Sequence, residues 1–271
     1  MAHFVVVPQW QGSASARAMQ LIDGAAAIRG DLPSSACTAV EVPAEAGESQ
    51  GTGVRRLSSL VRTWERVREA VAAAPPPPIV IGGDRGIAAA AADGTVGSDV
   101  GLIWFDARAA LHDPDPLTPR AFEDSTLRAI LGGGPAALRL PAGRIDPTRV
   151  VLAGVREIEE AEVRAIADLG ISRVTVEGLR SPDALRAALI STGVSRVFIH
   201  LDLSVIDPSG ITGVSAPVPF GPDAATLITR IRDVRAIAEM TGASLTGFAP
   251  ASPDTAIEDL PTVLRLIGAL A

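Results

Sequence analysis

Val100-Gly-Leu-Ile-Trp-Phe105, followed directly by Asp106-Ala-Arg-Ala-Ala-Leu-His-Asp-Pro-Asp115, is the stretch that decides the fold. The continuous apolar run from Val100 to Phe105 is typical of a strand buried on both faces of a parallel sheet. Asp106 stands where this strand should end. Open α/β sheets bind their ligands outside the carboxyl ends of the strands. We therefore expect Asp106 to lie at a functional site.

Two further stretches share this design. Ile79 to Gly86 reads Ile-Val-Ile-Gly-Gly-Asp-Arg-Gly, and Val197 to Ser209 reads Val-Phe-Ile-His-Leu-Asp-Leu-Ser-Val-Ile-Asp-Pro-Ser. Each is an apolar strand that runs into an acidic residue and turn-forming residues. Because the carboxyl ends of parallel strands meet at one edge of a sheet, we expect Asp84, Asp106 and Asp202 to lie near one another.

The rest of the chain alternates apolar runs with segments of helical spacing, which predicts one parallel sheet covered by helices on both faces. The expected strands are His3–Val7, Thr38–Val42, Ile79–Ile81, Val100–Phe105, Val150–Ala153, Val174–Glu177, Val197–Leu201 and Ser244–Phe248. The expected helices are Ala14–Ile28 with Ser13 as N-cap, Val54–Ala74, Ile87–Ala92, Pro119–Leu131, Glu159–Leu169, Pro182–Thr192, Pro222–Met240 and Thr255–Ala269. We predict an α/β three-layer sandwich of about eight strands, in a single domain over residues 1–271.

Composition excludes several classes of function. All 24 basic residues are arginine, so a Schiff-base lysine and a P-loop lysine are both excluded. A net charge of −7, dispersed arginines and the absence of tyrosine argue against a nucleic-acid surface. The single cysteine, Cys37, excludes an internal disulfide. No apolar run reaches 18 residues and no basic leader precedes the first strand, so we expect no membrane association and a cytoplasmic location.

The three strand-end stretches resemble the ureohydrolase family, which comprises arginase, agmatinase and formiminoglutamase. That family carries Gly-Gly-Asp-His after one strand, Asp-Ala-His-x-Asp after the next, and Asp-x-Asp followed by a Leu-Asp-Pro-like turn after a later one. The matching segments here read Gly82-Gly-Asp-Arg85, Asp106-Ala-Arg-Ala-Ala110 and Asp202-Leu-Ser-Val-Ile-Asp-Pro208. The resemblance implies an arginase-like fold, two manganese ions at these strand ends, and assembly into a trimer or hexamer.

The metal-ligand positions implied by this resemblance are mostly altered. Of six, only Asp106 and Asp202 keep a ligand residue, and the other four hold Arg85, Arg108, Ala110 and Ser204. Two carboxylates are too few for two ions, and arginine cannot deprotonate to ligate a metal. We therefore expect no manganese and no other cofactor. We also expect Arg85 and Arg108 to point into the crevice and face Asp106 and Asp202 in place of the ions.

Two supporting positions have changed as well. By the resemblance, Glu123 takes the place of a proton-shuttling histidine, and Gly247 replaces a glutamate that binds the substrate guanidinium. His200 lies inside a strand, where we expect a buried histidine whose hydrogen bonds are satisfied.

Two functions from different classes follow. In the first, the chain is a catalytically inactive ureohydrolase relative that binds a small-molecule ligand or serves as a subunit. In the second, it is a metal-independent hydrolase of a C–N bond in an amidine, guanidine or amide, which would use Glu123, Glu159 or His112. We favour the first, because no nucleophile–base pair is evident in the sequence.

Overall fold

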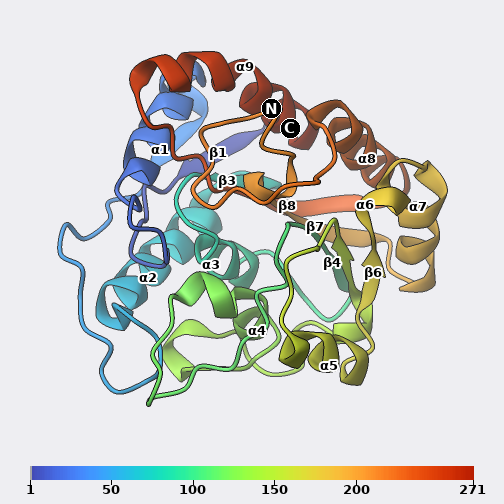
Figure 1. Ribbon diagram of the computed structural model, residues 1–271, viewed down its shortest axis with the longest axis horizontal. Helices are drawn as coiled ribbons and strands as arrows, with labels where there is room; N and C mark the ends of the chain where they lie inside the picture. The colour runs from blue at the N-terminus through green and yellow to red at the C-terminus, as the bar shows by residue number, and fades with distance from the viewer. Residues whose placement is uncertain (1) are drawn as a thin grey trace.

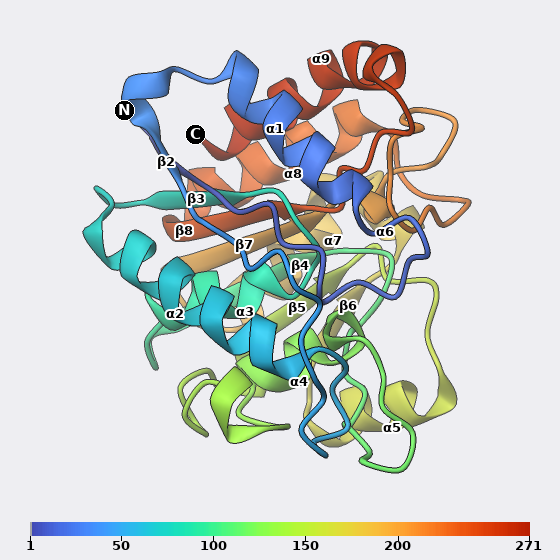
Figure 2. The same ribbon diagram turned by 90° about the vertical axis from the view of Figure 1, so that its left-hand side faces the viewer.

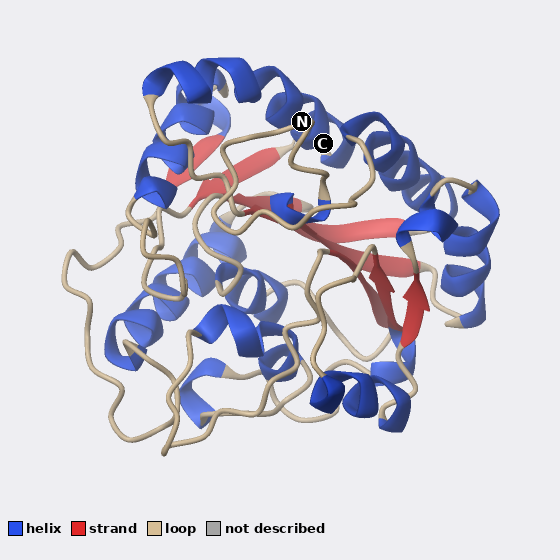
Figure 3. Cartoon of the chain, in the orientation of Figure 1, coloured by secondary structure: helices blue, strands red, loops and turns tan. Residues whose placement is uncertain are grey.

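In the computed structural model, which describes residues 2–271, eight parallel strands form one sheet with helices on both faces (Figures 1 and 3). Along the sheet the strand order is β2-β1-β3-β8-β7-β4-β5-β6. The strands are β1 (His3–Val6), β2 (Cys37–Ala39), β3 (Pro78–Ile81), β4 (Val100–Phe105), β5 (Val150–Ala153), β6 (Ser172–Val174), β7 (Arg196–Asp202) and β8 (Glu239–Thr246). The predicted fold class is confirmed.

The helices form two layers, one on each side of the sheet (Figure 2). One layer contains α1 (Gln20–Asp31), α6 (Val176–Leu179), α7 (Pro182–Ser191), α8 (Ala224–Ile237) and α9 (Pro253–Leu270). The other contains α2 (Leu57–Ala73), α3 (Ile87–Asp93), α4 (Thr126–Ile130) and α5 (Glu160–Asp168). Short 3₁₀ turns occur at Ser34–Ala36, Phe122–Ser125, Ala136–Leu138, Pro147–Arg149 and Leu203–Val205.

Strand β4 shows why the sheet is buried on both faces. Its residues alternate between the two layers: Leu102 and Trp104 pack with α2–α5, whereas Ile103 and Phe105 pack with α7–α9. All four side chains are fully buried. A strand with two apolar faces is stable only between two helical layers, which explains the unbroken run in the sequence.

Several predicted boundaries are wrong, each for a local reason. The helix predicted from Ala14 begins only at Gln20, because the Gly12 and Ala14 N–H groups donate to Asp84 and Glu123 instead. The helix predicted from Pro119 is a 3₁₀ turn followed by α4, because the backbone of Arg120 is hydrogen-bonded to Gly53 and Arg55.

Two further boundaries differ near the sheet. The strand predicted to end at Glu177 ends at Val174, because the Thr175 hydroxyl accepts from Gly178 N–H and starts α6. The helix predicted to reach Met240 ends at Ile237, and β8 begins at Glu239, whose N–H donates to the Ser195 carbonyl. No helix among residues 2–271 is both long and apolar enough to cross a membrane.

Gly24 is predicted to be required where α1 packs on the loop after β8. A Cβ at Gly24 would overlap the Phe248 carbonyl oxygen. Overpacking of this kind costs about 1–3 kcal/mol, so Gly24→Ala should lower the free energy of unfolding by that amount in urea denaturation. Gly30 in the same helix has open space around its Cβ position, and Gly30→Ala should instead stabilise by up to about 1 kcal/mol. Equal effects of the two substitutions would contradict this packing.

Candidate functional site

The centre of the site is a pair of aspartates at the ends of two neighbouring strands. Phe105 of β4 lies opposite Leu201 of β7, so the next residues, Asp106 and Asp202, also lie side by side. Adjacent strands are about 4.8 Å apart. Asp106 is fully buried and Asp202 is 4% exposed. Two carboxylates that are this close and shielded from water repel one another, by roughly 4 kcal/mol at 4 Å and an effective dielectric of 20.

Arg85 supplies the opposite charge. Its guanidinium forms a two-pronged pair with Asp106, through Nε to Oδ2 and through Nη2 to Oδ1 at 3.1 Å. Nη2 also lies 3.6 Å from Asp202 Oδ1, and Nη1 donates to the Glu123 carbonyl oxygen at 3.3 Å. The sequence prediction that Arg85 faces both aspartates is confirmed.

The turn before Arg85 determines where its side chain starts. Gly82 and Gly83 follow β3 with φ of +94° and +72°, and a Cβ at Gly83 would lie 2.7 Å from the Val7 carbonyl oxygen. The buried Asp84 carboxylate then accepts from the Gly12 and Gly86 N–H groups. This fixed turn lets Arg85 reach across β8 to the ends of β7 and β4.

The electrostatic effect of the pair is large on both partners. Burial raises the pKa of Asp106, but the Arg85 guanidinium, the nearby His200 ring and the Arg108 N–H together more than offset this, and the pKa falls to about 2. Burial lowers the pKa of Arg85, while Asp106 and then Asp202 raise it well above its ordinary value. Both groups are therefore charged at any physiological pH.

Hydroxyl groups also donate to each of the two carboxylates. Ser204 Oγ donates to Asp106 Oδ1 at 3.0 Å, and Thr246 Oγ1 donates to Asp202 Oδ2 at 2.7 Å. Ser204 occupies one of the positions where the resemblance places a metal ligand, and its side chain is a hydrogen-bond donor there.

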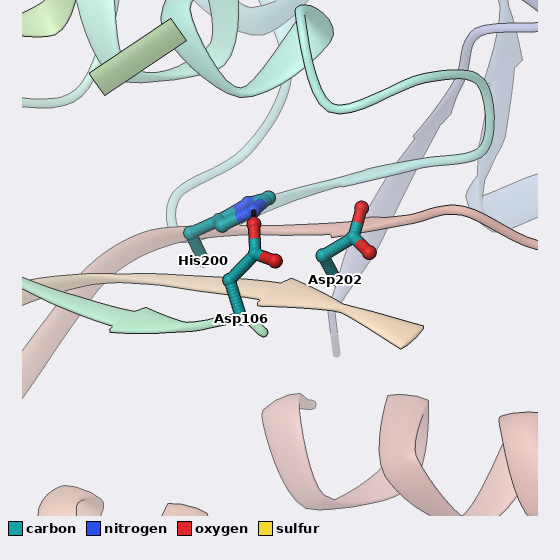
Figure 4. A group of neighbouring side chains, drawn as sticks. All are labelled: Asp106, His200 and Asp202. Atoms are coloured by element: carbon teal, nitrogen blue, oxygen red, sulfur yellow. Dashed lines mark ion pairs between the residues drawn. The ribbon is translucent and has the colours of Figure 1, made fainter. Parts of the chain in front are cut away.

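His200 is a third polar side chain in this cluster. It lies two residues before Asp202 on β7, so both side chains point to the same face of the sheet, beside Asp106 (Figure 4). Its Nδ1 is 2.8 Å from Ser244 Oγ, and its ring stacks on Trp104 with centroids 3.9 Å apart. Its Nε2 is 3.7 Å from Asp106 Oδ2, too far for a hydrogen bond.

The prediction for His200 was half right. Burial is confirmed, but within the described part of the chain Nε2 has no hydrogen-bond partner. The spacing of two between His200 and Asp202 on a strand could have placed this histidine in the site.

Arg108 does not face the aspartates, and that prediction is wrong. Its Nη2 donates to Glu157 Oε2 at 2.8 Å and its Nη1 to the Ala216 carbonyl at 3.1 Å. Only the backbone N–H of Arg108 contacts Asp106. Arg85 already supplies a cation at the buried carboxylates, and the second arginine finds its partners in the half-exposed part of the site.

Ala110 and Gly247, at two further positions that differ from the family pattern, both have positive φ angles. Ala110 is buried with φ of +55°, an uncommon conformation for a residue with a side chain. Gly247 has φ of +90°, and a Cβ there would lie 3.2 Å from both Asp202 carboxylate oxygens. A glutamate at position 247 would therefore be strained in this backbone.

A cleft of about 170 Å³ lies over the buried cluster. In it, His112 Nε2 is 3.1 Å from Glu159 Oε2 and His112 Nδ1 is 3.5 Å from Glu162 Oε1. The cleft is lined by basic, acidic and apolar residues: Arg85, Arg108, Ala110, His112, Arg120, Asp124, Glu157, Ile158, Glu159 and Glu162. The contact with His112 lowers the pKa of Glu159, and Arg120 adds to the effect.

The carboxylates of Glu162 and Glu123, by contrast, accept hydrogen bonds from backbone N–H groups. Glu162 accepts from the N–H groups of Leu111 and Glu159, which fixes the start of α5. Glu123 accepts from Ala14 N–H at 2.6 Å and does not line the cleft. Burial raises the pKa of Glu123 to about 7, although the charge of Arg85 opposes the shift.

Residues 11–259 match the family model described as the arginase family. The chain belongs to the arginase family. The predicted resemblance is thus confirmed.

Curated relatives within this family are arginases. The arginase of Staphylococcus aureus (strain MRSA252) is 27% identical over 71% of this chain and 66% of its own length. That of Bacillus caldovelox is 32% identical over 45% of this chain and 44% of its own length. The match to these relatives therefore spans about half to two thirds of their length.

Solved arginase-family structures share the fold over the whole chain. The Entamoeba histolytica arginase, solved in complex with L-ornithine, superposes with a TM-score of 0.85 at 20% identity, covering 99% of this chain and 97% of that one. Proclavaminate amidino hydrolase from Streptomyces clavuligerus gives a TM-score of 0.74 at 16% identity, covering 99% and 89%. At this level of identity the likeness establishes the fold alone.

The pairing of Arg85 with Asp106 predicts strong coupling in a double-mutant cycle. Arg85→Met or Asp106→Asn alone leaves a buried charge without its partner and should cost about 3–5 kcal/mol in the free energy of unfolding. The double variant should lose several kcal/mol less than the sum. The half-exposed pair Arg108–Glu157 is the matched control, with coupling of about 0.2–1 kcal/mol. Additive losses at Arg85 and Asp106 would contradict the pairing.

The raised pKa of Glu123 predicts a fall in stability as pH rises. A carboxyl that binds its proton more tightly when folded contributes stability below its unfolded pKa, near 4.5, and that contribution is lost as pH passes through about 7. Glu123→Gln keeps an acceptor for Ala14 N–H, so it should flatten the decline between pH 5 and 8 by on the order of 1–3 kcal/mol. Urea titrations at both pH values measure this. The exposed Glu258→Gln should leave the slope unchanged. Parallel profiles for wild type and Glu123→Gln would refute the assignment.

Proposed function

We propose that this arginase-family chain has lost the family's manganese-dependent hydrolysis and uses its cleft to bind a small polar molecule. One observation carries the proposal: the Arg85 guanidinium is paired with Asp106 and contacts Asp202, the two carboxylates retained from the metal-ligand positions. Guanidinium–carboxylate pairing of this kind is strong and directional.

The side chains present do not fit two manganese ions. A two-metal site needs carboxylates and imidazoles converging on ions about 3.5–4 Å apart. Here a fixed cation already lies against Asp106 and Asp202, and Arg108, Ala110 and Ser204 offer neither carboxylate nor imidazole. A divalent ion at the retained aspartates would also be repelled by Arg85.

The charges around the cleft support a ligand that carries both signs. Arg120 has an exposed guanidinium that uses Nη1 for Glu159, and the Glu157 and Glu159 carboxylates are more than half exposed. A small zwitterion can replace these surface pairs without leaving a charge unpaired. A thermal-shift screen of zwitterionic, cationic and anionic compounds should favour the zwitterions, and Glu159→Gln should weaken the shift.

A second candidate function is metal-independent hydrolysis of a C–N bond, and the position of His112 favours it. An imidazole beside Glu159 in a cleft is a plausible base with an orienting carboxylate. Activity that survives chelator and disappears in His112→Ala would establish this candidate in place of the first.

The proposal predicts that purified wild-type protein, loaded with Mn²⁺ and dialysed, retains no stoichiometric manganese by elemental analysis. It also predicts no urea release from arginine or agmatine at high protein concentration. The reason is that nothing here would lower the pKa of water from about 15.7 towards 7. Two equivalents of manganese per chain, or urea release that requires it, would disprove the proposed function.

A further inference from the structure

Asp106, His200 and Asp202 converge as a ligand set would. One ligand atom from each lies within 4.8 Å of the other two, and all three side chains are buried. Figure 4 shows the imidazole and the two carboxylates turned towards a common space. An imidazole with two carboxylates suits a divalent transition ion better than Mg²⁺ or Ca²⁺, which prefer oxygen ligands alone.

The hydrogen bonds around the three residues complete this resemblance to a metal centre. Metal-binding histidines usually have a partner on the ring nitrogen that does not bind the metal. His200 has this arrangement: Nδ1 is bonded to Ser244, and Nε2 has no hydrogen-bond partner within residues 2–271. Asp106 and Asp202 are each held by a hydroxyl, from Ser204 and Thr246.

We propose that Asp106, His200 and Asp202 form a latent single-metal site that the Arg85 guanidinium closes. Asp106 and Asp202 stand at two of the six positions discussed above, but His200 stands at none of them, so this combination of ligands differs from the one that the family resemblance implies. Arg85 is 3% exposed and lies on both carboxylates, so ion and guanidinium compete for the same anions. The inference rests on the proposed replacement of the metals by Arg85.

Removing the guanidinium should open the site. Arg85→Ala leaves two buried carboxylates without a cation, an unpaired imidazole nitrogen, and space for an ion with water as further ligands. We expect the variant to bind one Co²⁺ per chain at least about 100-fold more tightly than wild type, because a like charge at contact distance is gone. Equilibrium dialysis gives the stoichiometry, and the d–d absorption of Co²⁺ reports nitrogen and oxygen ligation.

Three matched variants separate this proposal from general effects. Arg85→Lys keeps a cation and should remain metal-free. Arg120→Ala removes an arginine from the cleft away from the three ligands and should also remain metal-free. Arg85→Ala combined with His200→Asn keeps an acceptor near Ser244 but lacks Nε2, and Co²⁺ affinity should fall about 10-fold or more.

Each outcome bears on the proposal. It is overturned if folded Arg85→Ala binds no Co²⁺, or if adding His200→Asn leaves affinity and spectrum unchanged. If Arg85→Ala and Arg85→Met both fail to fold without metal, refolding with Co²⁺ must restore the far-UV circular dichroism, and failure to do so also overturns it. Manganese binding or urea release by wild type would refute the proposed function, whereas a metal-free wild type with a metal-free Arg85→Ala refutes only this inference.

Discussion

The structure depends on how the repulsion between two buried carboxylates at neighbouring strand ends is offset. The β4–β7 register places Asp106 beside Asp202, and burial makes their repulsion strong. Some cation must lie against them. Here it is the Arg85 guanidinium, which brings five N–H donors and a charge that cannot be titrated away. Because this cation is covalently part of the chain, a positive charge lies against the two carboxylates whatever metal ions are present.

Much of the fold was predictable from the sequence because strands β3, β4 and β5 are short, apolar and fully buried. The run from Val100 to Phe105 can be stable only between two helical layers, and the strand-end motifs indicated the family. Boundaries were predicted less well where a side chain far away in sequence binds a backbone N–H. Asp84 and Glu123 bind Gly12 and Ala14 in this way and delay the first helix. No local pattern reports such a contact.

The sequence indicated which residues lie near the strand ends, but it predicted less well which way their side chains point. The retained aspartates and the substitution by Arg85 are visible in the sequence, and charge complementarity correctly predicted their pairing. The same argument failed for Arg108. The Arg85 guanidinium already lies against Asp106 and Asp202, and Arg108 pairs with the more exposed Glu157 nearby. The sequence predicts a buried His200 with satisfied hydrogen bonds, whereas its Nε2 has no hydrogen-bond partner within residues 2–271 and lies beside Asp106. Charge complementarity alone does not determine which of the two arginines pairs with the buried aspartates.

The central claim is that a guanidinium occupies the place where the family holds its metal cations. The most direct measurement is a crystal structure of the wild-type protein grown with millimolar Mn²⁺, with diffraction data collected on both sides of the manganese absorption edge. The account predicts planar guanidinium density for Arg85 against Asp106 and Asp202, and no anomalous peak between the two aspartates. An anomalous peak there, with the Arg85 side chain displaced into the cleft, would contradict it.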